Sequence, residues 1–127
     1  MRVAQDAGIR VITVDEVHRK GIAVVVAEAL DYIKASGIYV DLDLDVLDRV
    51  FAPATPGSRP GGLTPPDIRL AARLCGEDAR VRVLDIVEMD PTQDVADQTA
   101  LVAAACFLSF ASGVHRRCSL SPDVRNL

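Results

Sequence analysis

The chain has 127 residues, half of which are hydrophobic, and a formal net charge of −4 at pH 7. This length suits one compact domain, and the lack of a basic run argues against nucleic-acid binding. The three cysteines lack CxxC spacing, which argues against a zinc ribbon or a disulfide framework and favours a cytoplasmic protein. The longest apolar run, residues 100–114, is shorter than the roughly 20 residues of a membrane span, so we expect no membrane partner.

The first half of the chain predicts a strand, a helix and a second strand. The continuous β-branched run of residues 9–14 is typical of a strand that is buried on both faces. Residues 21–35 carry apolar side chains at steps of three and four, which predicts an amphipathic helix, with Gly37 as its terminator. The apolar run that begins at Ile38 predicts the second strand, and aspartates follow it.

The second half predicts a helix, a third strand and a long helix. Thr64 and the prolines after it predict a helix start with Thr64 as the N-cap, and we expect this helix to end at Gly76. Residues 80–89 predict the third strand. A long helix then begins at residue 94 or 97 and ends near residue 112. Its expected packing stripe consists of Leu101, Ala104, Ala105 and Leu108.

Strands separated by single helices predict an α/β fold in which helices flank a parallel sheet in three layers. Ligands of such sheets gather at the carboxyl ends of the strands. Asp43 and Asp45 lie at that end of the second strand, and Glu88 lies at that end of the third. We expect one domain over residues 1–113 and a polar, loosely ordered tail over residues 114–127.

Asp41, Asp43 and Asp45 alternate along the end of the second strand. Residues two apart in a strand share a face, so these carboxylates would repel one another unless a cation lay among them. The simpler alternative is that they cap or solvate the strand end. An EF-hand loop that starts at Asp41 would need glycine and glutamate where Val46 and Ala52 stand. A haloacid-dehalogenase-like phosphatase is a further alternative, although the lysine and second acidic pair of its site are not evident.

Two longer strings discriminate better. DLDVLD at residues 43–48 is followed by FAP at 51–53 and PGGL at 60–63, and LDIVEMDP stands at residues 84–91. The first set resembles the second metal-binding signature of the arginase/agmatinase (ureohydrolase) family, and the last string resembles that family's L-D-I-V-E-V-N-P strand. The resemblance extends from about residue 9 to residue 113 and implies the β-α-β-α-β-α portion of the arginase-type fold.

The resemblance implies a hydrolase that acts on C–N bonds of linear amidines with two Mn²⁺ ions. Asp43 would bridge the two ions, Asp45 would bind one of them, and Glu88 would hold the amidine or guanidinium group of the substrate. Carboxylate oxygens suit Mn²⁺, and two ions can deliver a bridging water as hydroxide. Asp48 is expected to fix the loop and Asp85 to be structural. Because relatives are commonly trimers or hexamers, we expect the full-length protein to be a homo-oligomer.

DVADQT at residues 94–99 and FLSFASG at 107–113 look most like the formimidoylglutamases of histidine breakdown. Their substrate, N-formimidoyl-L-glutamate, has an amidine at one end and carboxylates at the other. The loop departs from the family pattern and contains Arg59, which we expect to pair with a substrate carboxylate; an exposed loop arginine is the equal alternative. An agmatinase- or arginase-like substrate remains open, and Asp41 replaces the usual Ser or Thr without explanation.

The family's upstream Gly-Gly-(Asp/Asn)-His and Asp-x-His-x-Asp segments do not occur in this sequence. His18 and His115 are expected at the surface and do not replace them. We therefore expect a C-terminal portion of a ureohydrolase that supplies part of the site, binds Mn²⁺ weakly by itself and shows no turnover. A non-catalytic remnant or subunit module is the alternative. An in-frame Asp-x-His-x-Asp in the DNA upstream of Met1 would distinguish the two.

Overall fold

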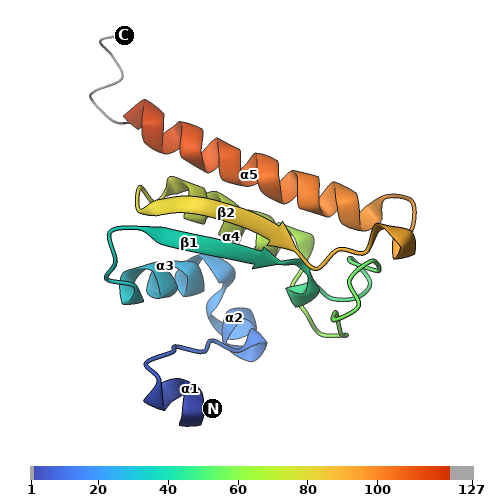
Figure 1. Ribbon diagram of the computed structural model, residues 1–127, viewed down its shortest axis with the longest axis horizontal. Coiled ribbons are helices and arrows are strands. Elements are labelled where there is room, and N and C mark those ends of the chain that lie inside the picture. The colour runs from blue at the N-terminus through green and yellow to red at the C-terminus, as the bar shows by residue number, and fades with distance from the viewer. Residues whose placement is uncertain (1, 121–127) are drawn as a thin grey trace.

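The computed structural model of the chain describes residues 2–120 and contains a pair of strands with helices packed on it (Figure 1). In chain order the elements are α1 (Arg2–Asp6), α2 (Val14–Lys20), α3 (Ile22–Tyr32), β1 (Ile38–Asp43), the 3₁₀ helix η1 (Leu44–Val46), α4 (Pro65–Glu77), β2 (Val81–Val87), the 3₁₀ helix η2 (Pro91–Gln93) and α5 (Gln98–Leu120).

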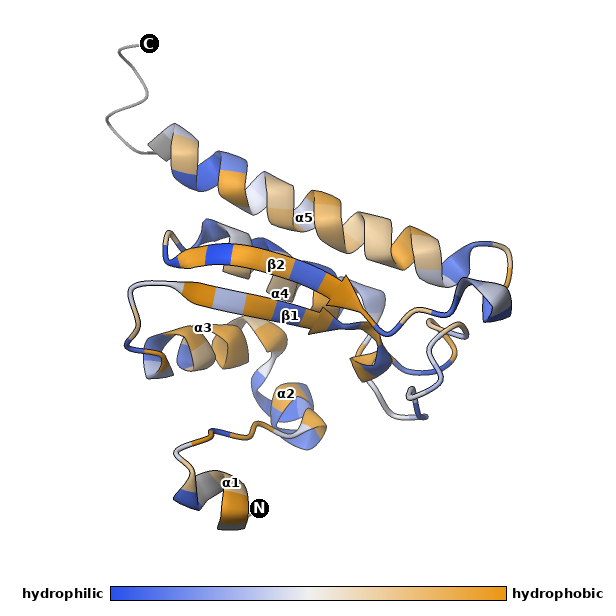
Figure 2. Cartoon of the chain, in the orientation of Figure 1, coloured by the Kyte–Doolittle hydropathy of each residue, from blue (hydrophilic) through white to orange (hydrophobic). Residues whose placement is uncertain are grey.

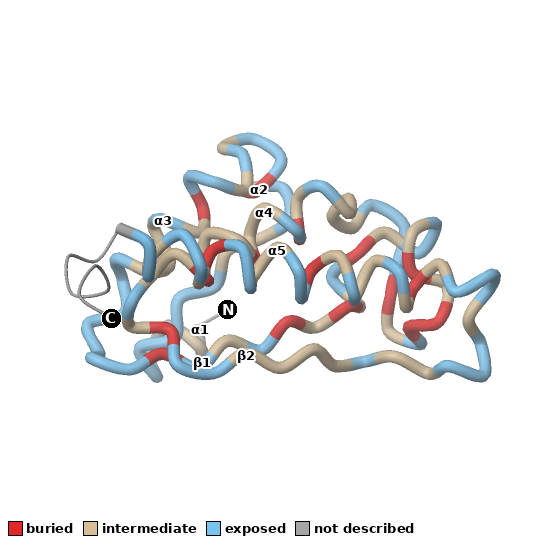
Figure 3. Tube along the Cα trace, turned by 90° about the horizontal axis from the view of Figure 1, so that it is seen from above, coloured by how far each residue is buried: buried red, intermediate tan, exposed pale blue. Residues whose placement is uncertain are grey.

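Strands β1 and β2 are parallel, and α4 is the crossover between them. Their register places Val40 beside Leu84 and Leu42 beside Ile86, which gives one apolar face. Helices α3, α4 and α5 lie on one side of the strands (Figure 3). Within residues 2–120 the opposite face is open, so that Tyr39 is 58% exposed. The predicted α/β class, with a parallel sheet and flanking helices, is confirmed.

The core lies between the apolar face of the sheet and helices α4 and α5. Figure 2 shows hydrophobic residues along both strands and over much of α5. The cluster of buried hydrophobic residues that forms this core also includes residues of the loop that follows β1. The packing that holds the helices on the sheet therefore also anchors this loop. The buried members of the cluster are Leu42, Leu44, Leu47, Ala52, Ile68, Ala72 and Cys106.

The strand predicted over residues 9–14 is wrong. Residues 9–13 form neither helix nor strand, and Val14 is the first residue of α2. Thr13 caps that helix by accepting a hydrogen bond from the backbone N–H of Glu16. Within the described residues this segment pairs with neither strand, and Val11 is 46% exposed. The end of the apolar run, Val14, is therefore helical because Thr13 caps a helix that begins there.

Two expected glycine terminators do not end their helices. Helix α3 ends at Tyr32, with Ile33 as its C-cap and Gly37 further along. Helix α4 has the predicted Thr64 N-cap, in a capping box with Asp67, but continues through Gly76 to Glu77. Gly76 instead lies where α5 crosses, because a Cβ there would stand 2.3 Å from the Phe110 carbonyl oxygen.

The crossing of α4 and α5 is close on both sides. A Cβ added to Gly113 of α5 would lie 2.2 Å from the carbonyl oxygen of Arg73 in α4. Gly113 and Cys106 are buried and stand two turns apart, with Thr99 a further two turns toward the start of the helix. The predicted packing stripe is wrong, since Leu101 and Leu108 are 65% and 66% exposed. Helix α5 is apolar around much of its circumference, so composition did not distinguish its two faces.

Helix α5 is also longer than expected. It continues to Leu120, so residues 114–120, which were expected in the tail, are helical. Residues 121–127 lie outside the described part of the chain. Residues 98–119 are long and apolar enough to cross a membrane, a length and composition that core helices of soluble proteins also reach. The expectation that this apolar segment is too short for a span is therefore corrected.

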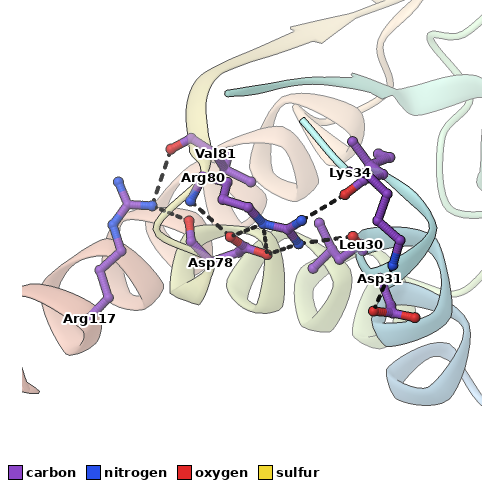
Figure 4. A network of polar contacts seen from close by, with 8 residues as sticks. Leu30, Asp31, Lys34, Asp78, Arg80, Val81 and Arg117 are labelled. Carbon is purple, nitrogen blue, oxygen red and sulfur yellow. Dashed lines mark hydrogen bonds and ion pairs between the residues drawn. The ribbon is translucent and has the colours of Figure 1, made fainter. Parts of the chain in front are cut away.

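Two arginines fasten the amino end of β2 to the helices beside it (Figure 4). The Arg80 guanidinium donates to the carbonyl oxygens of Leu30 and Ile33, at the end of α3, over 2.9 and 2.7 Å. It also pairs with Asp78 at 2.7 Å. Arg117 of α5 donates to the carbonyl oxygen of Asp78. These contacts hold the end of the sheet that lies away from the predicted site.

Candidate functional site

The three carboxylates predicted to carry the chemistry lie at the carboxyl edge of the sheet. Asp43 is the last residue of β1, Asp45 is in η1, and Glu88 directly follows β2. Both strands end beside the loop that follows η1 and the segment that precedes α5 (Figure 1). The backbone N–H of Asp45 donates to Asp43 Oδ1 over 3.0 Å, which fixes the first two residues relative to each other.

Charge at this edge is concentrated around Asp45. Burial raises the pKa of the Asp45 carboxyl, the negative charge of Asp43 and a hydrogen bond with it raise it further, and Glu88 adds to the effect. The positive charge of Arg59 acts in the opposite direction. The Asp45 carboxyl therefore interacts electrostatically with Asp43, Glu88 and Arg59. A bound cation would relieve the repulsion among the three carboxylates.

The donors present fit part of a manganese site. Carboxylate oxygens are hard ligands of the kind that Mn²⁺ accepts, and Asp43 and Asp45 are half-buried neighbours. No group of three or more His, Cys, Asp or Glu side chains within residues 2–120 is arranged to hold a metal ion by itself. The two aspartates would thus be two ligands of a larger set.

Asp41 lies beside Asp85 rather than beside Asp45, although Asp43 acts on both. It shares a face of β1 with Asp43 and lies beside Asp85 of β2 in the register. Loss of solvent raises the pKa of the Asp41 carboxyl, as do the charges of Asp85 and Asp43. The Tyr39 hydroxyl donates to Asp85. The predicted single face of three aspartates is wrong for Asp45, because β1 ends at Asp43 and η1 turns the chain.

Glu88 has an unusual backbone. Its φ is +62°, the left-handed region that residues with a Cβ rarely adopt, and its side chain is exposed. Strain of this kind persists where the surrounding structure holds the residue, and it clusters at functional sites. The strained turn places the Glu88 carboxylate immediately beyond the strand end, near Asp45.

Asp48 fixes the loop, as predicted. Its two carboxylate oxygens accept hydrogen bonds from the backbone N–H groups of Val50, over 2.9 Å, and Gly61, over 2.7 Å. These two bonds lower the pKa of the Asp48 carboxyl. They join the start of the Pro/Gly-rich loop to its end, so this carboxylate is committed to the loop.

Arg59 lies in that loop with its guanidinium turned onto the loop backbone. Nη1 donates to the carbonyl oxygens of Pro56, Gly57 and Ser58 over 3.2, 3.0 and 2.9 Å. These bonds hold the guanidinium where its positive charge acts to lower the pKa of the Asp45 carboxyl. His18 in α2 and His115 in α5 are exposed, as predicted for surface histidines.

Gly57 and Thr99 contact the site or its loop, and the sequence did not predict either role. A Cβ added to Gly57 would lie 2.1 Å from Asp45 Oδ2, so the loop backbone touches this carboxylate. Thr99, fully buried, accepts a hydrogen bond from the backbone N–H of Ala54 over 3.1 Å. In the sequence these residues are a glycine within a loop and a threonine shortly after Asp94. Neither residue type by itself indicates a functional site.

Comparison with known proteins identifies the family of the chain. Residues 1–112 match the family model described as "Arginase family". The chain is 35% identical over 114 residues to a formimidoylglutamase of Halalkalibacterium halodurans, covering 88% of this chain and 36% of that protein. It is 40% identical over 102 residues to a guanidinopropionase of Pseudomonas aeruginosa, covering 80% of this chain and 31% of that protein.

A solved structure agrees with the sequence relatives. The crystal structure of formimidoylglutamase from Bacillus subtilis superposes with a TM-score of 0.85 at 32% identity, covering 94% of this chain and 37% of that one. The chain spans about a third of the length of the curated relatives it matches. The family match favours the ureohydrolase interpretation over the phosphatase alternative. The chain belongs to the arginase family.

Proposed function

We propose that this chain supplies Asp43, Asp45 and Glu88 to a dinuclear manganese site that hydrolyses a linear amidine. The best candidate reaction converts N-formimidoyl-L-glutamate to glutamate and formamide. One observation carries the proposal: in a chain of the arginase family, these carboxylates meet at the carboxyl edge of the sheet. We further propose a cytoplasmic protein that forms a homo-oligomer at full length.

Asp43 and Asp45 would hold the metal. Two Mn²⁺ ions bound there would activate a water molecule as a nucleophile at neutral pH. The hydrogen bond between the Asp45 amide and Asp43 Oδ1 presets the spacing of the two ligands. Gly57 covers one side of the Asp45 carboxylate and limits the directions from which an ion or water can approach.

Glu88 and Arg59 would hold the substrate from its two ends. An exposed carboxylate suits a planar amidinium, because two N–H donors can pair with its two oxygens. Arg59, whose guanidinium is fastened by three loop carbonyls, would attract a substrate carboxylate. This pairing favours a substrate with an amidine at one end and acid groups at the other, which describes N-formimidoyl-L-glutamate.

The specific observation behind a second candidate is that the described residues do not complete a metal site. On that reading the chain is a subunit module without catalysis of its own. Among active alternatives, the guanidinopropionase similarity supports a guanidino acid, and agmatine or arginine is the remaining class.

The metal proposal is tested by titrating the purified chain with Mn²⁺ and following free Mn²⁺ by electron paramagnetic resonance. We expect weak, saturable binding that Asp43→Asn and Asp45→Asn each abolish. Asp31→Asn, which removes an exposed carboxylate of α3, is the matched control and should bind like wild type. Binding that survives both site substitutions would refute the assignment.

Turnover and substrate choice need separate assays. The chain with Mn²⁺ is offered N-formimidoyl-L-glutamate, guanidinopropionate, agmatine and arginine, and we expect no hydrolysis by the chain alone. Tight stoichiometric Mn²⁺ together with hydrolysis would show a complete site and overturn the partial one. Binding followed by NMR should weaken several-fold for N-formimidoyl-L-glutamate in Arg59→Glu but not for agmatine, which has no carboxylate. Equal affinity for the first ligand would remove the role of Arg59.

A further inference from the structure

The loop beside Asp45 is packed like a core although it contains polar residues. Ala52, Ala54, Thr55 and Ser58 are all fully buried. The Thr55 hydroxyl donates to the Ala52 carbonyl oxygen over 2.9 Å, and the Ser58 hydroxyl donates to the Thr55 carbonyl oxygen over 3.1 Å. Because its buried polar groups are satisfied internally, residues 52–58 form a stiff unit rather than a flexible loop.

This unit is attached to the rest of the molecule through Ala54. The Ala54 N–H donates to Thr99 Oγ1 over 3.1 Å, and its carbonyl oxygen accepts from the Asp90 N–H over 2.9 Å. A nearby contact, from Gln98 Nε2 to the Val50 carbonyl oxygen, measures 2.6 Å. The loop after β1 is thus fixed to the start of α5 and to the exit of β2.

Thr99 is itself held in place by Asp94. One Asp94 oxygen accepts the Thr99 N–H and the other accepts the Ala100 N–H, each over 3.0 Å. Burial raises the pKa of the Asp94 carboxyl, but hydrogen bonds from Thr99, Ala100 and Val95 outweigh this effect and leave it below its usual value. The first turn of α5 therefore presents the Thr99 hydroxyl oxygen to the loop in one fixed position.

The far end of the same unit meets the candidate metal ligand. Gly57 lies so close to Asp45 that an added Cβ would stand 2.1 Å from its Oδ2. A shift of the loop away from Thr99 would open this contact and free the Asp45 carboxylate to rotate. A carboxylate with several orientations binds a metal more weakly, because binding must then select one of them.

We propose that Thr99 is a positioning residue that acts through Ala54 and loop 52–58 to hold Asp45 in its metal-binding orientation. That Asp45 binds metal rests on the function proposed above. Thr99 is directed at the loop backbone, so its effect on the metal is transmitted by the chain of contacts from Ala54 to Gly57.

The test compares Thr99→Val, which keeps the shape but removes the acceptor, with Thr99→Ser, which restores it. In metal-free protein we expect Thr99→Val to speed amide hydrogen exchange at Ala54, Thr55 and Ser58 relative to the strand amides. With Mn²⁺ alone as the probe, its affinity should fall about 10-fold, and Thr99→Ser should recover both properties.

Val25→Ala provides the stability control, because Val25 is buried in α3 and lies outside the core cluster that includes Ala52. It should lower Tm without changing Mn²⁺ affinity. Unchanged affinity in Thr99→Val, or an equal loss in Val25→Ala, would overturn the proposal. If wild type binds no Mn²⁺, the proposed metal site fails, while faster exchange in Thr99→Val and its recovery in Thr99→Ser would still support the attachment of the loop.

Discussion

The crossing of α4 and α5 and the loop beside Asp45 both contain glycines that leave no room for a methyl group, but the neighbouring atoms differ in kind. At the crossing, the nearest atoms to Gly76 and Gly113 are carbonyl oxygens of the opposite helix. At the loop, the nearest atoms to Gly57 belong to the Asp45 side chain. A packed helix backbone resists displacement, whereas a carboxylate can rotate. The first contact therefore maintains the fold, and the second maintains the orientation of one functional group.

The largest effect is expected at the crossing. Gly76→Ala places a methyl group against the Phe110 carbonyl oxygen, and the helices must separate. Overpacking of this kind costs about 3 kcal/mol, which lowers Tm by about 10 °C in a domain of this size. Ser112→Ala, at an exposed position of α5, is the control and should leave Tm nearly unchanged. A Tm for Gly76→Ala within a degree of wild type would show that the crossing tolerates separation.

The loop should give the opposite pattern. Gly57→Ala forces the Asp45 carboxylate aside while the helices keep their packing. We expect Mn²⁺ binding to be lost in a titration, with a Tm decrease that is small beside that of Gly76→Ala. Gly37→Ala, whose added Cβ would be 3.8 Å from the nearest atom, Arg82 Cγ, should bind Mn²⁺ normally. Retained binding in Gly57→Ala would break the distinction between the two contacts.

The smallest effect is expected at Asp48, whose two hydrogen bonds join the start of the Pro/Gly-rich loop to its end. Asp48→Asn keeps the side-chain shape but replaces one of the two oxygens that accept from Val50 and Gly61. Because the folded-state pKa of Asp48 is lowered, its stabilisation is present above the usual value of 3.8 and is lost as the pH falls through the lowered one.

Wild type should therefore exceed Asp48→Asn in Tm near neutral pH, and the difference should shrink in acid below pH 3.8. Thermal scans across this range, with Asp31→Asn as the exposed-carboxylate control, measure it. A difference that grows on acidification would contradict the assigned role of Asp48.

The same contrast explains what the sequence could predict. Strands β1 and β2, the Thr64 cap and the positions of Asp43 and Glu88 at the ends of their own strands follow from local patterns, because each depends on residues close together in the chain. That the two strand ends lie at one edge follows from the rule that a strand–helix–strand unit pairs its strands in parallel. The strand at residues 9–14 failed because a strand also needs a neighbour, and the described residues provide none there. The contacts of Gly57 and Thr99 join segments far apart in sequence, so no local pattern contains them.

The parallel pairing of β1 and β2 has a consequence for how the protein folds. Asp43 and Glu88 are separated in the sequence by the Pro/Gly-rich loop and all of α4. They become neighbours only when β1 and β2 pair with each other. Pairings between distant segments pay their loop-closure entropy before they gain contacts, which makes them slow steps. The α4 capping box can form from local sequence alone, whereas we expect the carboxylate edge to form later, because it needs the pairing of β1 with β2. A nascent or partly unfolded chain would therefore form the first turn of α4 before it could bind a metal ion at the carboxylate edge.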